Sequence, residues 1–195
     1  MEIHAANGYL VDQFLRTGSN QRSDLYGGKA LNRVRFLAQA VENVLEVWEA
    51  QRVGVRLSPT GTFNDMADND PQETFGTAIE RLRSCGIGYL HMVESSQDSP
   101  AITGAEKQLF ASLRNQWDGF YIVNGNYDRE RGEEAVRTGY ADAVAYGRAF
   151  LANPDLPRRL QLRATLNTPD PPTFYGGDSR GYTDYPFLTD TAVSS

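Results

Sequence analysis

The sequence has few cysteines and histidines, no excess of basic residues and no long apolar run. Its single cysteine, Cys85, cannot form a disulfide within the chain, which suits a reducing compartment, and two histidines with one cysteine far apart predict no metal site. The net charge of −6 argues against a nucleic-acid-binding surface. No apolar run approaches the roughly 20 residues of a membrane helix, and the polar first residues predict no secretory signal. We therefore expect a cytoplasmic protein that binds neither nucleic acid nor membranes.

A regular alternation of short apolar runs and helical patterns is present instead. The 195 residues suffice for one globular domain. Apolar runs bounded by Gly, Pro, Asn or Asp predict buried parallel strands at 53–57, 87–93, 120–123 and 143–146. Amphipathic patterns and capping residues predict helices near 29–50, 71–85, 105–114, 129–138 and 153–164. The segment from residue 167 onward, rich in Pro, Gly, Asp and Tyr, indicates an ordered loop or a flexible end.

The alternation fits an open doubly wound sheet and a (β/α)8 barrel alike. Polar residues at the carboxyl ends of successive strands favour the barrel, because barrel enzymes assemble their sites there; these residues are Arg56, Glu94, Asn124 and Arg148. A full barrel typically needs about 250 residues, so four strands and a remnant predict an α/β fold that is half a barrel or slightly more. Its open edges and exposed inner face predict completion by another chain or a second copy.

A cluster of polar side chains opens the chain. His4, Asn7 and Tyr9 lie directly behind the apolar Ile3, an arrangement that predicts the mouth of an active site. Only three residues precede His4, and a buried strand needs about five, so we expect the strand that carries the cluster to be cut short.

Longer motifs extend this cluster along the chain. They read HAANGYL at 4–10, QFL at 13–15, SNQRSDLYGG at 19–28, RLSP at 56–59, YLHM at 89–92, YGR at 146–148, FYGG at 174–177 and GYTDYP at 181–186. Together they resemble the Old Yellow Enzyme family of flavin-dependent ene-reductases. The resemblance covers only the C-terminal part of the family's barrel. It implies a partial TIM barrel at 1–165, from the end of strand 4 through strand 8 and its helix, and a C-terminal tail at 166–195.

The resemblance implies a reaction that the residue types fit. NADH or NADPH would reduce FMN, which would pass a hydride to the β-carbon of an enone, enal, maleimide or nitroalkene. His4 and Asn7 would bind the substrate oxygen, since imidazole N–H and amide NH₂ both donate hydrogen bonds that stabilise developing enolate charge. Tyr9 would protonate the α-carbon, because a phenol of pKa about 10 keeps its proton at neutral pH. A complementary N-terminal fragment or a second copy would supply the missing flavin environment.

Further residues are expected to bind the cofactor. Arg56 lies within an apolar strand; the resemblance places it against the pyrimidine edge of the flavin, and a structural ion pair is the alternative. Asn124-Gly125 and Gly147-Arg148 follow successive strands and predict a phosphate site, with backbone N–H groups and a guanidinium as donors. The resemblance places Phe174 by the flavin and Tyr175 in the substrate pocket, whereas simple packing is the alternative for both.

Two other functions stay open at this point. The chain alone would be a non-catalytic half barrel that binds flavin or phosphate, or the barrel would act on a different, phosphorylated metabolite. His91 is expected to be a hydrogen-bonded barrel histidine, Cys85 a small packed side chain, and Arg22, Asp24 and Tyr26 supports for the loop before the first long helix.

Overall fold

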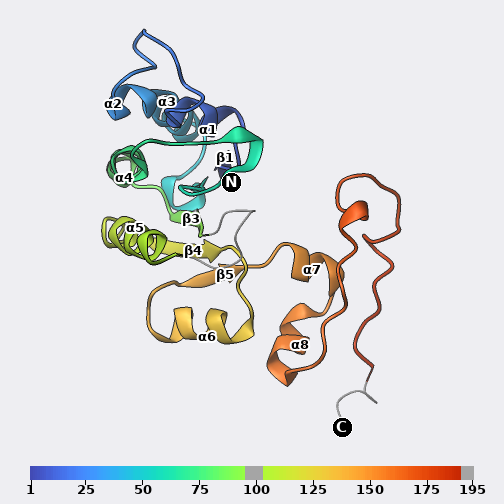
Figure 1. Ribbon diagram of the computed structural model, residues 1–195. Helices are drawn as coiled ribbons and strands as arrows, with labels where there is room; N and C mark the ends of the chain where they lie inside the picture. The colour runs from blue at the N-terminus through green and yellow to red at the C-terminus, as the bar shows by residue number, and fades with distance from the viewer. Residues whose placement is uncertain (95–102, 190–195) are drawn as a thin grey trace. The chain divides into compact units, whose positions relative to one another are not determined.

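A parallel sheet organises the chain in the computed structural model, which describes residues 1–94 and 103–189 (Figure 1). Its strands are β1 (Glu2–Ala5), β2 (Gly54–Leu57), β3 (Tyr89–Val93), β4 (Phe120–Asn124) and β5 (Ala143–Ala145). They lie side by side in chain order, and β1 through β4 pair in parallel. A doubly wound sheet reverses its strand order at a switch point, whereas sequential order is that of a (β/α)8 barrel. The expectation of a partial barrel is confirmed.

The strand register divides the sheet into two chemically different faces. His4 pairs with Arg56, Arg56 with His91, and His91 with Ile122, so these side chains form one row across four strands. Their chain neighbours point the opposite way. On that opposite face Leu57, Met92 and Val123 are fully buried against the helices. The apolar core therefore lies between sheet and helices, and the polar row lies on the face that a closed barrel turns inward.

The helices cover the core side of the sheet. They are α1 (Leu10–Leu15), α2 (Ala30–Arg33), α3 (Arg35–Leu45), α4 (Pro71–Cys85), α5 (Gly104–Asn115) and α6 (Arg129–Arg137). Contacts of α3 with α4 and of α4 with α5 form a continuous layer, visible in Figure 1. Short 3-10 helices occupy 50–52 and 63–65. Among the described residues, no helix is both long enough and apolar enough to cross a membrane.

The expected single helix over 29–50 is wrong. The structure divides it at Val34 into α2 and α3, and α3 ends at Leu45. The apolar spacing continues as far as Trp48, but the core does not: Val47 is 83% exposed, and Trp48 stacks under the Arg52 guanidinium at 5.4 Å. Periodicity alone therefore overestimated the length of this helix. Helix α1 was not anticipated, because it is only six residues long.

Residues 145–195 form a second compact unit, described here through residue 189. It contains α7 (Arg148–Ala152), α8 (Leu156–Leu162) and a 3-10 helix at 171–173. The expected helix over 153–164 is wrong in its start: Asn153 is extended, as the residue before a proline tends to be, so helix formation resumes only at Leu156.

The described part of the tail is ordered by hydrogen bonds to α8. Arg159 donates to the Pro186 carbonyl at 2.8 Å, and the Leu188 N–H donates to Asp155 at 2.6 Å. These bonds group α8 with the tail, so the boundary between compact units precedes Ala145, whereas the sequence-based division falls at residue 165. The expectation for the last residues, 190–195, lies outside the described part of the chain.

Candidate functional site

The proposed catalytic residues occupy the end of β1 and the turn that follows it. His4 lies on the strand itself, and β1 has four residues, as many as β2. Asn7 and Tyr9 lie on the turn, with Tyr9 directly before α1. The rings of His4 and Tyr9 are 5.2 Å apart between centroids, and Tyr9 is 51% exposed. The structure thus brings the imidazole and the phenol together at the carboxyl end of the sheet.

The turn has an unusual backbone. Asn7 and Gly8 both adopt the left-handed region, with φ of +57° and +71°. A side chain at Gly8 would place its Cβ 2.5 Å from the Phe63 carbonyl oxygen, so only glycine fits there. Asparagine is among the few other residues that tolerate this conformation. The Asn-Gly sequence therefore has a structural reason in addition to the role proposed for the Asn7 amide.

The electrostatic environment keeps His4 neutral. Partial burial and the nearby positive charge of Arg56 lower the pKa of the His4 imidazole below its ordinary value of 6.5. At neutral pH the ring therefore carries one N–H donor and no charge. The paired positions of His4 and Arg56 on adjacent strands place a neutral donor beside a fixed cation.

Arg56 is held by one of the other expected cofactor residues. Its Nη2 donates to the Asn124 side-chain oxygen at 2.8 Å, across the strand that separates β2 from β4. Burial lowers the pKa of the guanidinium, which still stays charged at neutral pH. Its Nε is buried and has no hydrogen-bond partner among the described residues. A half-buried cation with a free donor on the barrel's inner face fits a ligand atom that carries negative charge there.

His91 completes the polar row as a hydrogen-bonded barrel histidine, as expected. Its Nδ1 lies 3.0 Å from the Glu2 carboxylate, and this contact is the main reason that the pKa of Glu2 is lowered. Two other expectations about supporting residues are confirmed as well. Arg22 pairs with Asp24, which also accepts the Tyr26 N–H in the loop before α2, and Cys85 packs at the margin of the core.

The other expected cofactor and substrate residues divide between the two units. Gly125 follows β4 with φ of +117°, and its carbonyl accepts from Arg131 at 3.2 Å. Gly147 and Arg148 belong to the second unit, where Arg148 begins α7. Phe174 and Tyr175 are there too, with their rings 6.4 Å apart edge to face and Tyr175 96% exposed. Within each unit the geometry is compatible with the expected roles, which stay predictions.

A buried carboxylate bound by three tyrosines was not anticipated. Glu94, 2% exposed, accepts hydrogen bonds from Tyr121 at 3.2 Å, from Tyr127 at 2.8 Å and from Tyr140 at 2.5 Å. Its own N–H donates to the Asn124 carbonyl at 2.7 Å. Burial raises the pKa of Glu94. The cluster therefore fixes the carboxyl end of β4, where Asn124 holds Arg56. The sequence signal that it offered was a glutamate directly after an apolar strand.

We expect the three tyrosines of this cluster to resist alkaline titration. Burial, and then the charge of Glu94, raise the pKa of Tyr121, Tyr127 and Tyr140 above the ordinary value of 10. Because the folded-state pKa is the higher one, their contribution to stability is complete below pH 10 and is lost as the pH rises through the folded values. Ultraviolet titration of phenolate should show them ionising only on unfolding, and Tyr127→Phe should remove one such proton. Ionisation of all tyrosines near pH 10 in the folded protein would contradict this.

A sequentially ordered parallel sheet with polar side chains at its carboxyl edge defines part of a (β/α)8 barrel enzyme. Residues 1–167 match the NADH:flavin oxidoreductase / NADH oxidase family, and the chain belongs to this family of FMN-linked oxidoreductases. The resemblance to Old Yellow Enzyme is confirmed.

Relatives and solved structures agree with this assignment. The chain is 47% identical over 192 residues to 12-oxophytodienoate reductase 1 from Oryza sativa subsp. japonica, covering 96% of the chain and 50% of that protein. Morphinone reductase superposes with a TM-score of 0.89 at 43% identity, over 97% of this chain and 50% of that one. The old yellow enzyme from Trypanosoma cruzi has a TM-score of 0.89 at 34% identity, over 96% and 49%. The chain spans 49% to 62% of the length of the curated relatives it matches.

Proposed function

We propose that this chain supplies the C-terminal half of an FMN-dependent ene-reductase that reduces activated C=C bonds. The carrying observation is the arrangement at the carboxyl end of β1 and β2. His4 and Arg56 are paired on neighbouring strands and face the same side of the sheet, and the Tyr9 phenol lies against His4. Membership of a flavin oxidoreductase family supports redox chemistry at this place.

The residues present fit a flavin. Arg56 offers a cation and an unpartnered Nε on the inner face of the sheet, and Asn124 fixes the orientation of its guanidinium. Such a cation suits the pyrimidine edge of FMN, where negative charge develops on reduction. Phe174 would contribute an aromatic surface beside the ring. When bound, FMN supplies the hydride that the β-carbon of the alkene receives.

This chain's own residues supply the remaining chemistry. His4, kept neutral by partial burial and by Arg56, donates an N–H to the carbonyl or nitro oxygen of the substrate, and the Asn7 amide donates the second hydrogen bond. Two donors on one oxygen stabilise the enolate charge that develops there. Tyr9 then delivers its phenolic proton to the α-carbon. Tyr175 would line the substrate pocket.

The substrate and reductant follow from the same argument. Enones, enals, maleimides and nitroalkenes share an activated C=C bond next to an oxygen that two donors can bind. NADH or NADPH would be the reductant. The description of the matched family includes NADH, and one structure of morphinone reductase is a complex with tetrahydroNAD. The test is anaerobic mixing of the flavin-reduced, assembled barrel with 2-cyclohexenone. Reoxidation of the flavin with formation of the saturated ketone supports the proposal, and an inert reduced flavin overturns it.

We expect Arg148→Ala to weaken the retention of FMN by about 1.5–3 kcal/mol, the contribution of a charge-assisted hydrogen bond. Asn124-Gly125 and Gly147-Arg148 would provide the phosphate contacts in the assembled enzyme. Riboflavin lacks the phosphate, so its affinity should hardly change. Fluorescence titration of both flavins with the wild type and the variant measures the difference, and an equal loss for both would show that Arg148 does not bind phosphate.

A second candidate rests on the length of the chain. Because it spans about half of its relatives, the chain alone would be a non-catalytic half barrel that binds flavin or phosphate weakly. A complementary N-terminal half or a second copy would then be required for turnover.

A further inference from the structure

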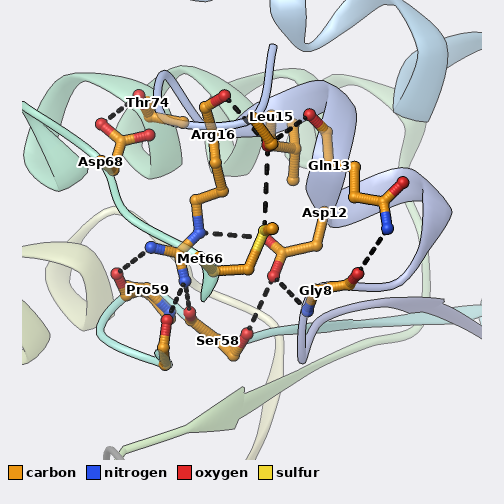
Figure 2. Close-up of polar contacts among 12 residues, drawn as sticks. Gly8, Asp12, Gln13, Leu15, Arg16, Ser58, Pro59, Met66, Asp68 and Thr74 are labelled. Carbon is orange, nitrogen blue, oxygen red and sulfur yellow. Dashed lines mark hydrogen bonds and ion pairs between the residues drawn. The ribbon is translucent and has the colours of Figure 1, made fainter. Parts of the chain in front are cut away.

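A buried ion pair lies next to the turn that carries Asn7 and Tyr9. Asp12 and Arg16 are one helical turn apart, with side chains 0% and 2% exposed, and Arg16 Nε lies 3.1 Å from Asp12 Oδ1 (Figure 2). Burying two charges costs desolvation energy that offsets most of their attraction, so such a pair is a poor source of stability by itself. Its hydrogen bonds to the surrounding loops indicate a different role.

The second oxygen of Asp12 organises the turn. Asp12 Oδ2 accepts the Gly8 N–H at 2.9 Å and lies 3.4 Å from the Ser58 hydroxyl, and Ser58 Oγ in turn accepts the Asn7 N–H at 2.8 Å. A carboxylate only accepts hydrogen bonds, so the Ser58 hydroxyl donates to Asp12 and keeps a lone pair for Asn7. An asparagine at position 12 would lose the charge and would turn an NH₂ group either toward Arg16 Nε or toward the Gly8 N–H and the Ser58 hydroxyl.

Arg16 connects Asp12 to the loop after β2. Its guanidinium donates to the carbonyl oxygens of Pro59 at 3.0 Å, of Gly61 at 3.1 Å and of Ser58, as Figure 2 shows in part. This loop begins directly after Leu57, the last residue of the strand that carries Arg56. The ion pair thus connects the turn after β1 with the strand that holds the proposed flavin contact.

The turn gains from such support because two successive residues adopt the left-handed region, Asn7 with φ of +57° and Gly8 with φ of +71°. Asparagine and glycine tolerate this conformation, and hydrogen bonds to the surrounding groups select it. The two carbonyl oxygens of the turn are also bound: Asn7 O accepts from Asn64 at 3.0 Å, and Gly8 O accepts from Gln13 at 2.7 Å. All four backbone polar groups of Asn7 and Gly8 therefore have partners, two of them through Asp12 and Ser58.

We propose that Asp12, Arg16 and Ser58 form a positioning cluster that fixes the Asn7–Tyr9 turn relative to β2. The cluster sets where the Asn7 amide and the Tyr9 phenol meet the substrate, without touching the substrate itself. A displacement of about 1 Å at a reacting group can cost about a hundredfold in rate. This inference rests on the proposed function, because it assigns the turn's purpose to substrate binding and protonation.

The second unit contains a matched control. Asp155 and Arg159 repeat the arrangement: Arg159 Nε lies 2.7 Å from Asp155 Oδ1, Asp155 Oδ2 accepts a backbone N–H from Leu188, and Arg159 donates to two carbonyl oxygens. These bonds of the pair lie within the second unit, where it holds the tail at Pro186 and Leu188. Asp155→Asn therefore removes the same chemistry at a place where the proposal predicts no effect on the turn.

The first measurement uses hydrogen exchange in this chain without flavin. Asp12→Asn should speed amide exchange at Gly8 by about ten- to a hundredfold, the factor that a hydrogen bond to a charged group contributes. Ser58→Ala, a milder change, should speed amide exchange at Asn7. Asp155→Asn should leave amide exchange at both Asn7 and Gly8 unchanged. Unchanged protection at both amides in both variants would overturn the proposal.

The second measurement separates positioning from mere stability. In the assembled enzyme, Asp12→Asn and Ser58→Ala should each lower the rate of flavin reoxidation by 2-cyclohexenone about tenfold or more. Flavin reduction by the nicotinamide should stay as in the wild type. Faster exchange with an unaltered reoxidation rate would overturn the positioning role. A wild type that never reduces enones would sink the proposed function, while the exchange data would still decide whether the cluster holds the turn.

Discussion

Replacing Tyr9 with Phe is expected to slow enone reduction by about 10²–10⁴-fold in the assembled enzyme, the usual contribution of a positioned acid. The substitution keeps the ring beside His4 and removes only the hydroxyl that would protonate the α-carbon. Tyr9 is half exposed, so the substitution should hardly change the stability of the fold. Single-turnover mixing of reduced enzyme with 2-cyclohexenone measures the step directly.

The control for this prediction is the other half-reaction. Flavin reduction by the nicotinamide does not need the phenol and should proceed as in the wild type. Tyr26→Phe, which removes a hydroxyl bonded to Gln39 in an exposed loop, should leave both half-reactions unchanged. Strongly activated nitroalkenes are unsuitable probes because water can replace the acid. A Tyr9→Phe enzyme that reduces cyclohexenone at the wild-type rate would remove Tyr9 from the mechanism.

Local signals predicted the parts of the fold that local interactions determine. Helix α4 is the clearest case, because the sequence marks both of its ends. The Asp70 side chain accepts the Glu73 N–H at 2.9 Å, Pro71 occupies the first helical position, and Gly86 ends the helix with φ of +68°. The strands were found for a similar reason, since buried parallel strands are continuous apolar runs.

The errors arose where tertiary contacts override a local pattern. The apolar spacing near Trp48 is helical, yet no core is present there to bury that face. At Asn153 the following proline imposes an extended backbone that periodicity does not register. Helix limits of this kind depend on neighbours that the sequence alone does not place.

The candidate site divides in the same way. The residues proposed for the chemistry, His4, Asn7 and Tyr9, were evident because they lie close together in the chain. The cluster proposed to position them was missed, since Asn7 reaches Ser58 across 51 residues and Arg16 reaches Gly61 across 45. The spacing of Asp12 and Arg16 was a visible signal, but most such pairs on helices are surface ion pairs of little consequence. Only the long-range hydrogen bonds of the structure show that this pair lies at the candidate site.

We expect the isolated chain to be inactive and to self-associate, and an N-terminal half barrel to restore FMN binding and enone reduction together. The inner face of the sheet carries apolar side chains that a closed barrel would bury: Phe120 is 49% exposed, and Ile122 is half-buried beside it. Among the described strands, β1 and β5 end the sheet. A strand at the end of a sheet can pair with another chain along its outer edge. The measurement is gel filtration, with flavin absorbance and enone reduction followed in each fraction. It compares the chain alone with the chain mixed with the N-terminal half of a 12-oxophytodienoate reductase, and it reports association, FMN binding and activity.

A pair of aspartate substitutions makes this expectation specific to the inner face. Phe120→Asp should weaken assembly with the N-terminal half, because burying an unpaired carboxylate in the closed barrel is costly. Val47→Asp, at a position that lies just after the end of α3 and is 83% exposed, adds the same charge and should assemble as the wild type does. FMN binding and turnover should fall together with assembly, since the proposed flavin contacts require both halves. A monodisperse, yellow and fully active monomer of this chain alone would overturn the split-barrel interpretation.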